Sequence, residues 1–187
     1  MTKKKTQTMT LMCGLPRSGK STWIRKNCTS EVIVSPDQIR AKIFGHQFHS
    51  NSEGFIWAFA EAMAKLLLEQ GKDIIIDATN ITYESRSTWI NIASTYGAKV
   101  KIVFFRTSMK SCKRRNEKSD AGNKLPEKVI DNMAIWFEDP VYGDEDDIEV
   151  IHVGGRKISQ KEHFSGLLRN YYVNDALKLN AKAEIKK

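Results

Sequence analysis

Short runs of apolar residues alternate along this chain with longer segments in which apolar residues recur every three or four positions. The short runs predict strands buried on both faces, and the longer segments predict amphipathic helices. This alternation is typical of βαβ units on a mostly parallel sheet, so the sequence predicts an α/β fold. The predicted strands are residues 7–13, 31–34, 73–77, 99–105 and 148–153.

Two segments, 53–69 and 127–137, show the clearest helical spacing. We expect the apolar stripe of each to pack against the core rather than to bind a cofactor. The stripes consist of Phe55, Phe59, Met63 and Leu67 in the first segment, and of Val129, Met133 and Phe137 in the second. A chain of 187 residues buries one sizeable core, so we expect a single domain over residues 1–187, with its core at about residues 8–153.

The amino-acid composition limits the kinds of molecule that the protein is expected to bind and the compartment that suits it. The formal net charge of +8 predicts attraction to polyanions such as nucleotides, nucleic acids and acidic metabolites. Three cysteines without metal-ligand spacing argue against a disulfide framework or a zinc site, and a reducing cytoplasm suits them best. The N-terminal apolar run is too short and interrupted for a signal peptide or a spanning helix, so no membrane association is expected.

The strongest motif is Gly-x-x-x-x-Gly-Lys-Ser at residues 14–21, between a predicted strand and a predicted helix. This is the phosphate loop, or P-loop, in which backbone N–H groups and the start of a helix surround phosphate oxygens. We expect Lys20 to contact the β- and γ-phosphates of ATP and Ser21 to bind Mg²⁺. The residues predicted to bind the nucleotide here are Gly14, Leu15, Pro16, Arg17, Ser18, Gly19, Lys20, Ser21 and Thr22.

An acidic residue follows the second predicted strand. Ser35 and Pro36 predict a helix start, with Ser35 as N-cap, which places Asp37 at the carboxyl end of the strand. Ligands bind at this edge of open α/β sheets, so Asp37 is a candidate base for an attacking hydroxyl. Arg40, on the same helix face, is a candidate contact to the acceptor. The alternative is that Asp37 only stabilises the helix start and Arg40 is a surface residue.

Asp77 closes the third predicted strand and is followed by Ala-Thr-Asn. It is a candidate to bind substrate, either by orienting Arg40 or by holding a magnesium-bound water. The equally supported alternative is that Asp77, or Asn80, only caps the turn after the strand.

A basic segment at residues 110–118 predicts a helix, and a glycine-containing connection to residue 125 follows it. Kinases use cations that close over the transferring phosphoryl group, so residues 110–125 are the expected lid. Arg115 is the first candidate for that cation and Arg114 the second. The alternative is a solvated charged face. Residues 154–187 predict a basic helical tail that packs on the domain or contacts nucleic acid.

In their order along the chain these elements resemble the polynucleotide 5′-kinase family of phages and bacteria. The family's G-x-P-x-S-G-K-S/T loop, [SN]-x-D-x-[IYL]-R element, D-x-T-N segment and R-N lid correspond here to residues 14–22, 35–40, 77–80 and 115–116. The likeness spans about residues 8–153. It implies a doubly wound, three-layer P-loop kinase fold with a basic helical lid.

The resemblance also implies roles. Lys20 and Ser21 would bind ATP and Mg²⁺, Asp37 would act as general base, Arg40 would engage the acceptor, and Arg115 would belong to the lid. The implied reaction is phosphorylation of a 5′-hydroxyl of DNA or RNA, in a bacterial or phage-infected cytosol. Two alternatives stay open: a hydroxyl acceptor on a modified base or small metabolite, and a non-catalytic ATP-dependent switch. The sequence indicates no oligomeric state and leaves a homo-oligomer open.

Overall fold

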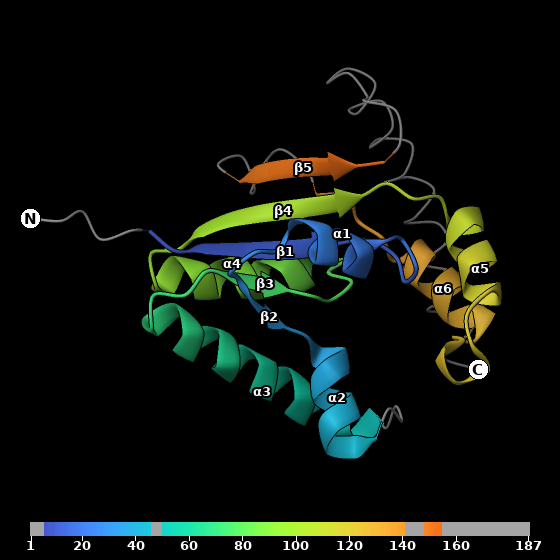
Figure 1. Cartoon of the computed structure of the whole chain (residues 1–187), viewed down its shortest axis with the longest axis horizontal. Helices are drawn as coiled ribbons and strands as arrows, with labels where there is room; N and C mark the ends of the chain where they lie inside the picture. The colour runs from blue at the N-terminus through green and yellow to red at the C-terminus, as the bar shows by residue number, and fades with distance from the viewer. Residues whose placement is uncertain (1–5, 46–49, 141–147, 155–187) are drawn as a thin grey trace, which may run out of the picture.

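The computed structural model describes residues 6–45, 50–140 and 148–154. Its five strands form one parallel sheet in the order β2-β3-β1-β4-β5 (Figure 1). The strands are β1 (Thr8–Cys13), β2 (Val32–Val34), β3 (Ile74–Ile76), β4 (Lys99–Phe105) and β5 (Glu149–Val153). All five predicted strands are confirmed, because buried parallel strands leave continuous apolar runs in the sequence.

Helices connect the strands and cover both faces of the sheet. They are α1 (Lys20–Asn27), α2 (Pro36–Phe44), α3 (Ser50–Glu69), α4 (Tyr83–Thr95), α5 (Met109–Glu117) and α6 (Glu127–Ile135), with the short 3₁₀ helix η1 (Ala121–Asn123). Among the described residues, no helix combines the length and apolarity needed to cross a bilayer. The predicted tail lies, from residue 155 on, outside the described residues.

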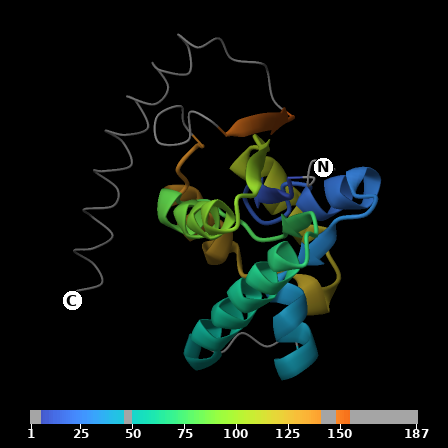
Figure 2. The same cartoon turned by 90° about the vertical axis from the view of Figure 1, so that its left-hand side faces the viewer.

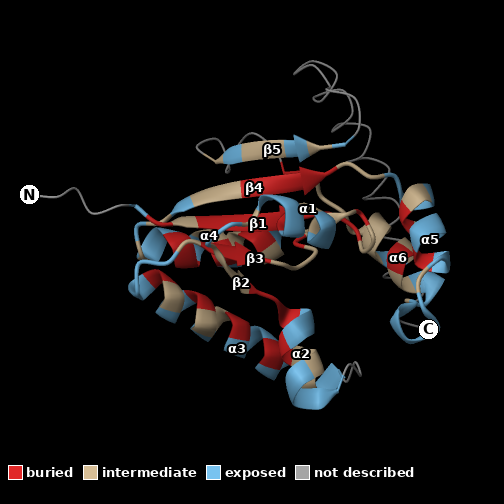
Figure 3. Ribbon diagram, viewed as in Figure 1, coloured by how far each residue is buried: buried red, intermediate tan, exposed pale blue. Residues whose placement is uncertain are grey.

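The two faces of β1 pack against different layers (Figure 2). Met9 and Leu11 belong to the larger core, which contains the buried faces of α3 and α4. Met12 belongs to a smaller core with Ile24 of α1 and Phe105 of β4. The sheet is therefore the middle layer of three, as predicted. Figure 3 shows the central strands as the most deeply buried part of the molecule.

The predicted core stripe of α3 is wrong for its two phenylalanines. Phe55 and Phe59 are 53% and 42% exposed, and only Met63 and Leu67 pack partly against the core. The buried face lies one residue further along, at Ile56, Ala60, Ala64 and Leu68. The predicted α6 stripe is also only partly buried. Met133 and Phe137 pack partly against a small core, whereas the buried residue of α6 is Ile130, outside the stripe, and the helix ends at Ile135. Phe137, beyond the helix, stacks on Phe104 with ring centroids 5.9 Å apart.

Ser35 begins α2 as predicted. Its side chain accepts a hydrogen bond from the backbone N–H of Gln38, and Pro36 occupies the first turn. Removing an N-cap hydroxyl costs about 1 kcal/mol, so Ser35→Ala is expected to lower the free energy of unfolding by that amount in urea titrations. Ser87→Ala is the control, because that hydroxyl donates to the Glu84 carbonyl within its own helix and does not cap the helix start. Equal losses in the two variants would contradict the capping role.

Candidate active site

The carboxyl ends of the strands carry the candidate site. In Figure 1 the strand arrowheads point toward α5 and α6, and the P-loop leaves β1 at this edge. β1 lies between β3 and β4. After β1 the chain forms β2 and β3 on one side of it, and then β4 and β5 on the other side. Such a reversal of strand order is where open α/β sheets bind ligands.

The P-loop has the backbone of a phosphate cradle. A Cβ on Gly14 would lie 2.8 Å from both the Phe105 side chain and the Ser18 hydroxyl, so this approach requires glycine. Gly19 has a φ of 115°, and Arg17 adopts a left-handed φ of 64°. Arg17 therefore takes a backbone conformation that glycine adopts most readily.

Polar groups of this loop remain available to an anion. In the described part of the chain, no side chain caps the start of α1, and the buried Ser18 hydroxyl has no hydrogen-bond partner. Lys20 Nζ donates to the Gly14 and Leu15 carbonyls, at 2.9 Å each, and so lies across the loop. An ammonium, a helix start without a side-chain cap and an unpaired hydroxyl suit the phosphates of a nucleotide.

Ser21 is exposed in the first turn of α1, where the motif places the magnesium ligand. The described residues contain no cluster of three or more His, Cys, Asp or Glu side chains that could hold a metal ion. Mg²⁺ commonly binds through one or two protein oxygens together with substrate phosphates. The exposed Ser21 hydroxyl fits that mode, and binding of Mg²⁺ by Ser21 stays a prediction. Thr22, the next residue, accepts a hydrogen bond from Arg25.

The segment after β3 is hydrogen-bonded to the start of the P-loop and to the end of β1. Thr79 accepts a hydrogen bond from the Gly14 N–H at 2.9 Å. Asn80 is buried and donates to the Met12 carbonyl at 2.9 Å. Asn80 therefore joins this turn to the end of β1, which is a structural role close to the capping alternative that the sequence left open.

The cation that acts on the Asp77 carboxyl is Lys20. Burial raises the pKa of the Asp77 carboxyl, and the neighbouring Lys20 opposes that shift. Burial likewise lowers the pKa of Lys20, while Asp77 acts in the opposite direction. The predicted role of Asp77 in orienting Arg40 is wrong, since the carboxylates bonded to Arg40 come from Asp37 and Glu53. Binding of a magnesium-bound water by Asp77 stays a prediction.

Arg40 lies between two carboxylates. Its Nη1 donates to Asp37 at 2.6 Å, while its Nε and Nη2 form two 2.7 Å bonds with Glu53. These bonds, those with Glu53 above all, raise the pKa of Arg40. The Asp37 side chain is 87% exposed, whereas those of Arg40 and Glu53 are mostly buried. The arrangement holds a fixed guanidinium beside an accessible carboxylate.

Glu53 is the site residue that sequence reasoning missed. Its carboxylate lies 13 positions after Arg40 on another helix, so no local spacing connects them. Hydrogen bonds to charged groups contribute roughly 1.5–3 kcal/mol, and Glu53→Gln is expected to lower the free energy of unfolding by about that much. Glu61→Gln is the matched control on α3, because Glu61 makes a 3.7 Å surface pair with Lys65 worth under about 1 kcal/mol. Urea unfolding of both variants tests the difference, and equal effects would contradict it.

The predicted lid contacts the P-loop backbone. Arg115, on α5, donates through Nη1 to the Arg17 carbonyl at 3.0 Å and to the Ser18 carbonyl at 2.9 Å. Arg17 in turn donates to the Asn123 carbonyl in η1. The predicted helix at 110–118 is confirmed as α5, and its basic residue Arg115 reaches the loop. Arg114 and Arg115 are both exposed.

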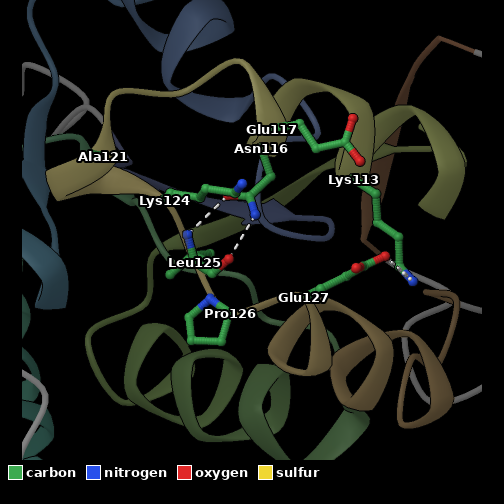
Figure 4. Close-up of a pocket in the computed structure, with 8 residues that line it drawn as sticks. All are labelled: Lys113, Asn116, Glu117, Ala121, Lys124, Leu125, Pro126 and Glu127. Atoms are coloured by element: carbon green, nitrogen blue, oxygen red, sulfur yellow. Dashed lines mark hydrogen bonds and ion pairs between the residues drawn. The ribbon is translucent and has the colours of Figure 1, made fainter.

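A cavity of about 500 Å³ lies within the lid (Figure 4). Its lining comes from α5, η1 and the start of α6, and the Asn116 amide bonds both the N–H and the carbonyl of Leu125 there. Lys113 pairs with Glu127 at 2.9 Å at its edge. The predicted catalytic residues do not line it, so the chemistry is assigned to the sheet edge.

The parallel sheet, its phosphate loop and the basic helix over that loop define a kinase-like P-loop domain. The chain belongs to the AAA domain family, which it matches over residues 9–140.

Solved structures support the fold. The chain resembles a protein in the structure of the Pnkp1/Rnl/Hen1 RNA repair complex at 27% identity, with a TM-score of 0.60 over 71% of this chain and 44% of that one. It therefore spans less than half of that protein. It also resembles Chaetomium thermophilum Kti12 in complex with ADP-AlF3, at 16% identity and a TM-score of 0.56 over 90% and 96% of the two chains. A gluconokinase from Sinorhizobium meliloti 1021 is similar at 14% identity and a TM-score of 0.52, over 94% and 98%.

Proposed function

We propose that this chain transfers the γ-phosphate of ATP to the 5′-hydroxyl of a DNA or RNA strand. The observation that carries the proposal is the exposed Asp37 carboxylate held by Arg40 at the carboxyl end of β2. A carboxylate in this position can accept the proton of an attacking hydroxyl. The guanidinium beside it suits an acceptor that carries a phosphate next to the hydroxyl.

Each residue has a place in this reaction. The P-loop amides and Lys20 bind the phosphates of ATP, and Ser21 would hold Mg²⁺, which offsets charge on the transferring group. Asp37 takes the hydroxyl proton, and Glu53 fixes Arg40 as a positioning residue. Arg115 brings a cation to the phosphate loop. The likeness to a protein of an RNA repair complex, at 27% identity, supports a nucleic-acid acceptor, as does the net charge of +8.

The test is a transfer assay with γ-labelled ATP and oligonucleotides of DNA and of RNA, each with either a 5′-hydroxyl or a 5′-phosphate. We expect label only on the 5′-hydroxyl strands, and no transfer by a Lys20→Ala control prepared in parallel. Label mapped to a base, or found only on a small alcohol, would select the alternative acceptors. ATP binding without transfer to any acceptor would select the switch.

A further inference from the structure

Three phenylalanine rings are exposed where α2 meets α3. Phe44, Phe55 and Phe59 are 37%, 53% and 42% exposed. The rings of Phe44 and Phe55 meet edge to face, and those of Phe55 and Phe59 stack at an interplanar angle of 23°, with centroids 6.1 Å apart in both pairs. Contiguous aromatic surface of this kind marks a binding site, because its exposure to water is unfavourable.

This aromatic row begins at the proposed acceptor site. Phe44 follows Asp37 by seven residues and Arg40 by four on α2, so the three share one helix face. The rise of a helix places Phe44 about 10 Å beyond Asp37. From Phe44 the row continues to Phe55 and Phe59 on α3. The rings therefore extend outward from the carboxylate proposed to activate the hydroxyl.

We propose that the aromatic row binds the bases of the acceptor strand that follow its 5′-terminal nucleotide, and this inference rests on the proposed function. Bases of any sequence stack on aromatic rings, and such platforms beside a basic surface bind single strands. A strand whose 5′ end lies at Asp37 passes Arg40 and meets Phe44, then Phe55 and Phe59. The net charge of +8 favours the polyanion.

A second copy of the chain is the other occupant that apolar surface could accept. Leu66, further along α3, is 58% exposed and would belong to such an interface. Two features favour the strand. The rings gather at the end of α3 that contacts α2. Stacking also requires rings, whereas a protein interface accepts aliphatic residues equally.

The experiment measures transfer to a nucleoside 3′-monophosphate and to 5′-hydroxyl strands of increasing length, using Phe55→Leu, Phe59→Leu and Leu66→Ala. Leucine keeps the apolar surface and removes the ring. We expect the KM for the long strands to rise roughly fivefold or more in both phenylalanine variants. The kcat, the KM for ATP and the KM for the monophosphate should stay unchanged. Leu66→Ala should match the unaltered protein throughout.

In the kinetic and light-scattering measurements, three results would overturn the platform. An equal KM increase for the monophosphate and the long strands would mean that the substitution does not act on the bases beyond the 5′-terminal nucleotide. An equal effect of Leu66→Ala indicates general apolar docking. A dimer by light scattering that becomes a monomer in Phe55→Leu assigns the surface to a second copy. Failure of the proposed function is separable, because anisotropy of a labelled strand measures binding without transfer. Unaltered binding by Phe55→Leu, or no binding by the unaltered protein, contradicts the platform by itself.

Discussion

Asp37→Asn is expected to lower the rate of phosphoryl transfer to a 5′-hydroxyl strand by roughly 10²- to 10⁴-fold, the usual contribution of a positioned general base. Asparagine has nearly the same shape and keeps an oxygen that can accept the 2.6 Å hydrogen bond from Arg40. It cannot take a proton from the attacking hydroxyl. Because the side chain is 87% exposed, the substitution leaves the packing of α2 unchanged.

Single-turnover transfer with saturating ATP measures this effect, and ATP binding should be unchanged. Asp131→Asn is the matched control, because the Asp131 carboxylate pairs with Lys113 at the same 2.6 Å but lies on α6 rather than on α2. We expect the control to transfer at nearly the unaltered rate. Retention of more than a tenth of the rate by Asp37→Asn would show that this residue only stabilises the start of its helix.

The strands and the P-loop could be predicted from sequence because their signals are local. A parallel strand that is buried on both faces requires a continuous apolar run, as in β3, where all three isoleucines are buried. The phosphate loop needs glycine at fixed spacing, since Gly14 lies against Phe105 and Gly19 has a positive φ. Both the strands and the P-loop are therefore determined by residues that lie close together in the sequence.

The buried face of α3 could not be chosen from spacing alone. Its predicted stripe, with Phe55 and Phe59, and its observed core stripe, with Ile56 and Ala60, are offset by one residue, which is about 100° around a helix. Hydrophobicity favours the phenylalanines, whereas the buried positions include alanines, which let α3 lie close to the sheet. Large exposed rings on this helix are therefore a deviation from ordinary packing, as expected where residues serve binding.

The partner of Arg40 was unpredictable for a different reason. Asp37 lies three residues away on the same helix, so local geometry brings the two together. Glu53 comes from α3, and only the packing of two helices places its carboxylate against the guanidinium. Asp77, at the end of the neighbouring strand β3, lies near Lys20 instead. Strand ends indicate which residues share an edge, but they do not determine which of them touch.

Arg115→Ala and Arg114→Ala are expected to differ by roughly 10³-fold in kcat, although both remove one cation from the same turn of α5. Arg115 contacts the carbonyls of Arg17 and Ser18, within the loop that cradles the phosphates. In the proposed reaction it would supply charge next to the transferring phosphoryl group, where a fixed cation stabilises the transition state. Arg114 and Arg115 are both exposed, and Arg115 differs by its two contacts to the loop. Arg114 is therefore expected to add only to the general attraction of the surface for polyanions.

The paired design separates the lid from a solvated basic face. Both variants lose the same charge, so any change in salt-dependent attraction of the strand should be equal between them. Steady-state kinetics at two salt concentrations should show a similar small rise in the KM for the strand in each variant. The loss in kcat should be confined to Arg115→Ala, with ATP still bound. Equal losses of kcat would mean that α5 acts through its overall charge, and the assignment of Arg115 to the transferring phosphoryl group would be wrong.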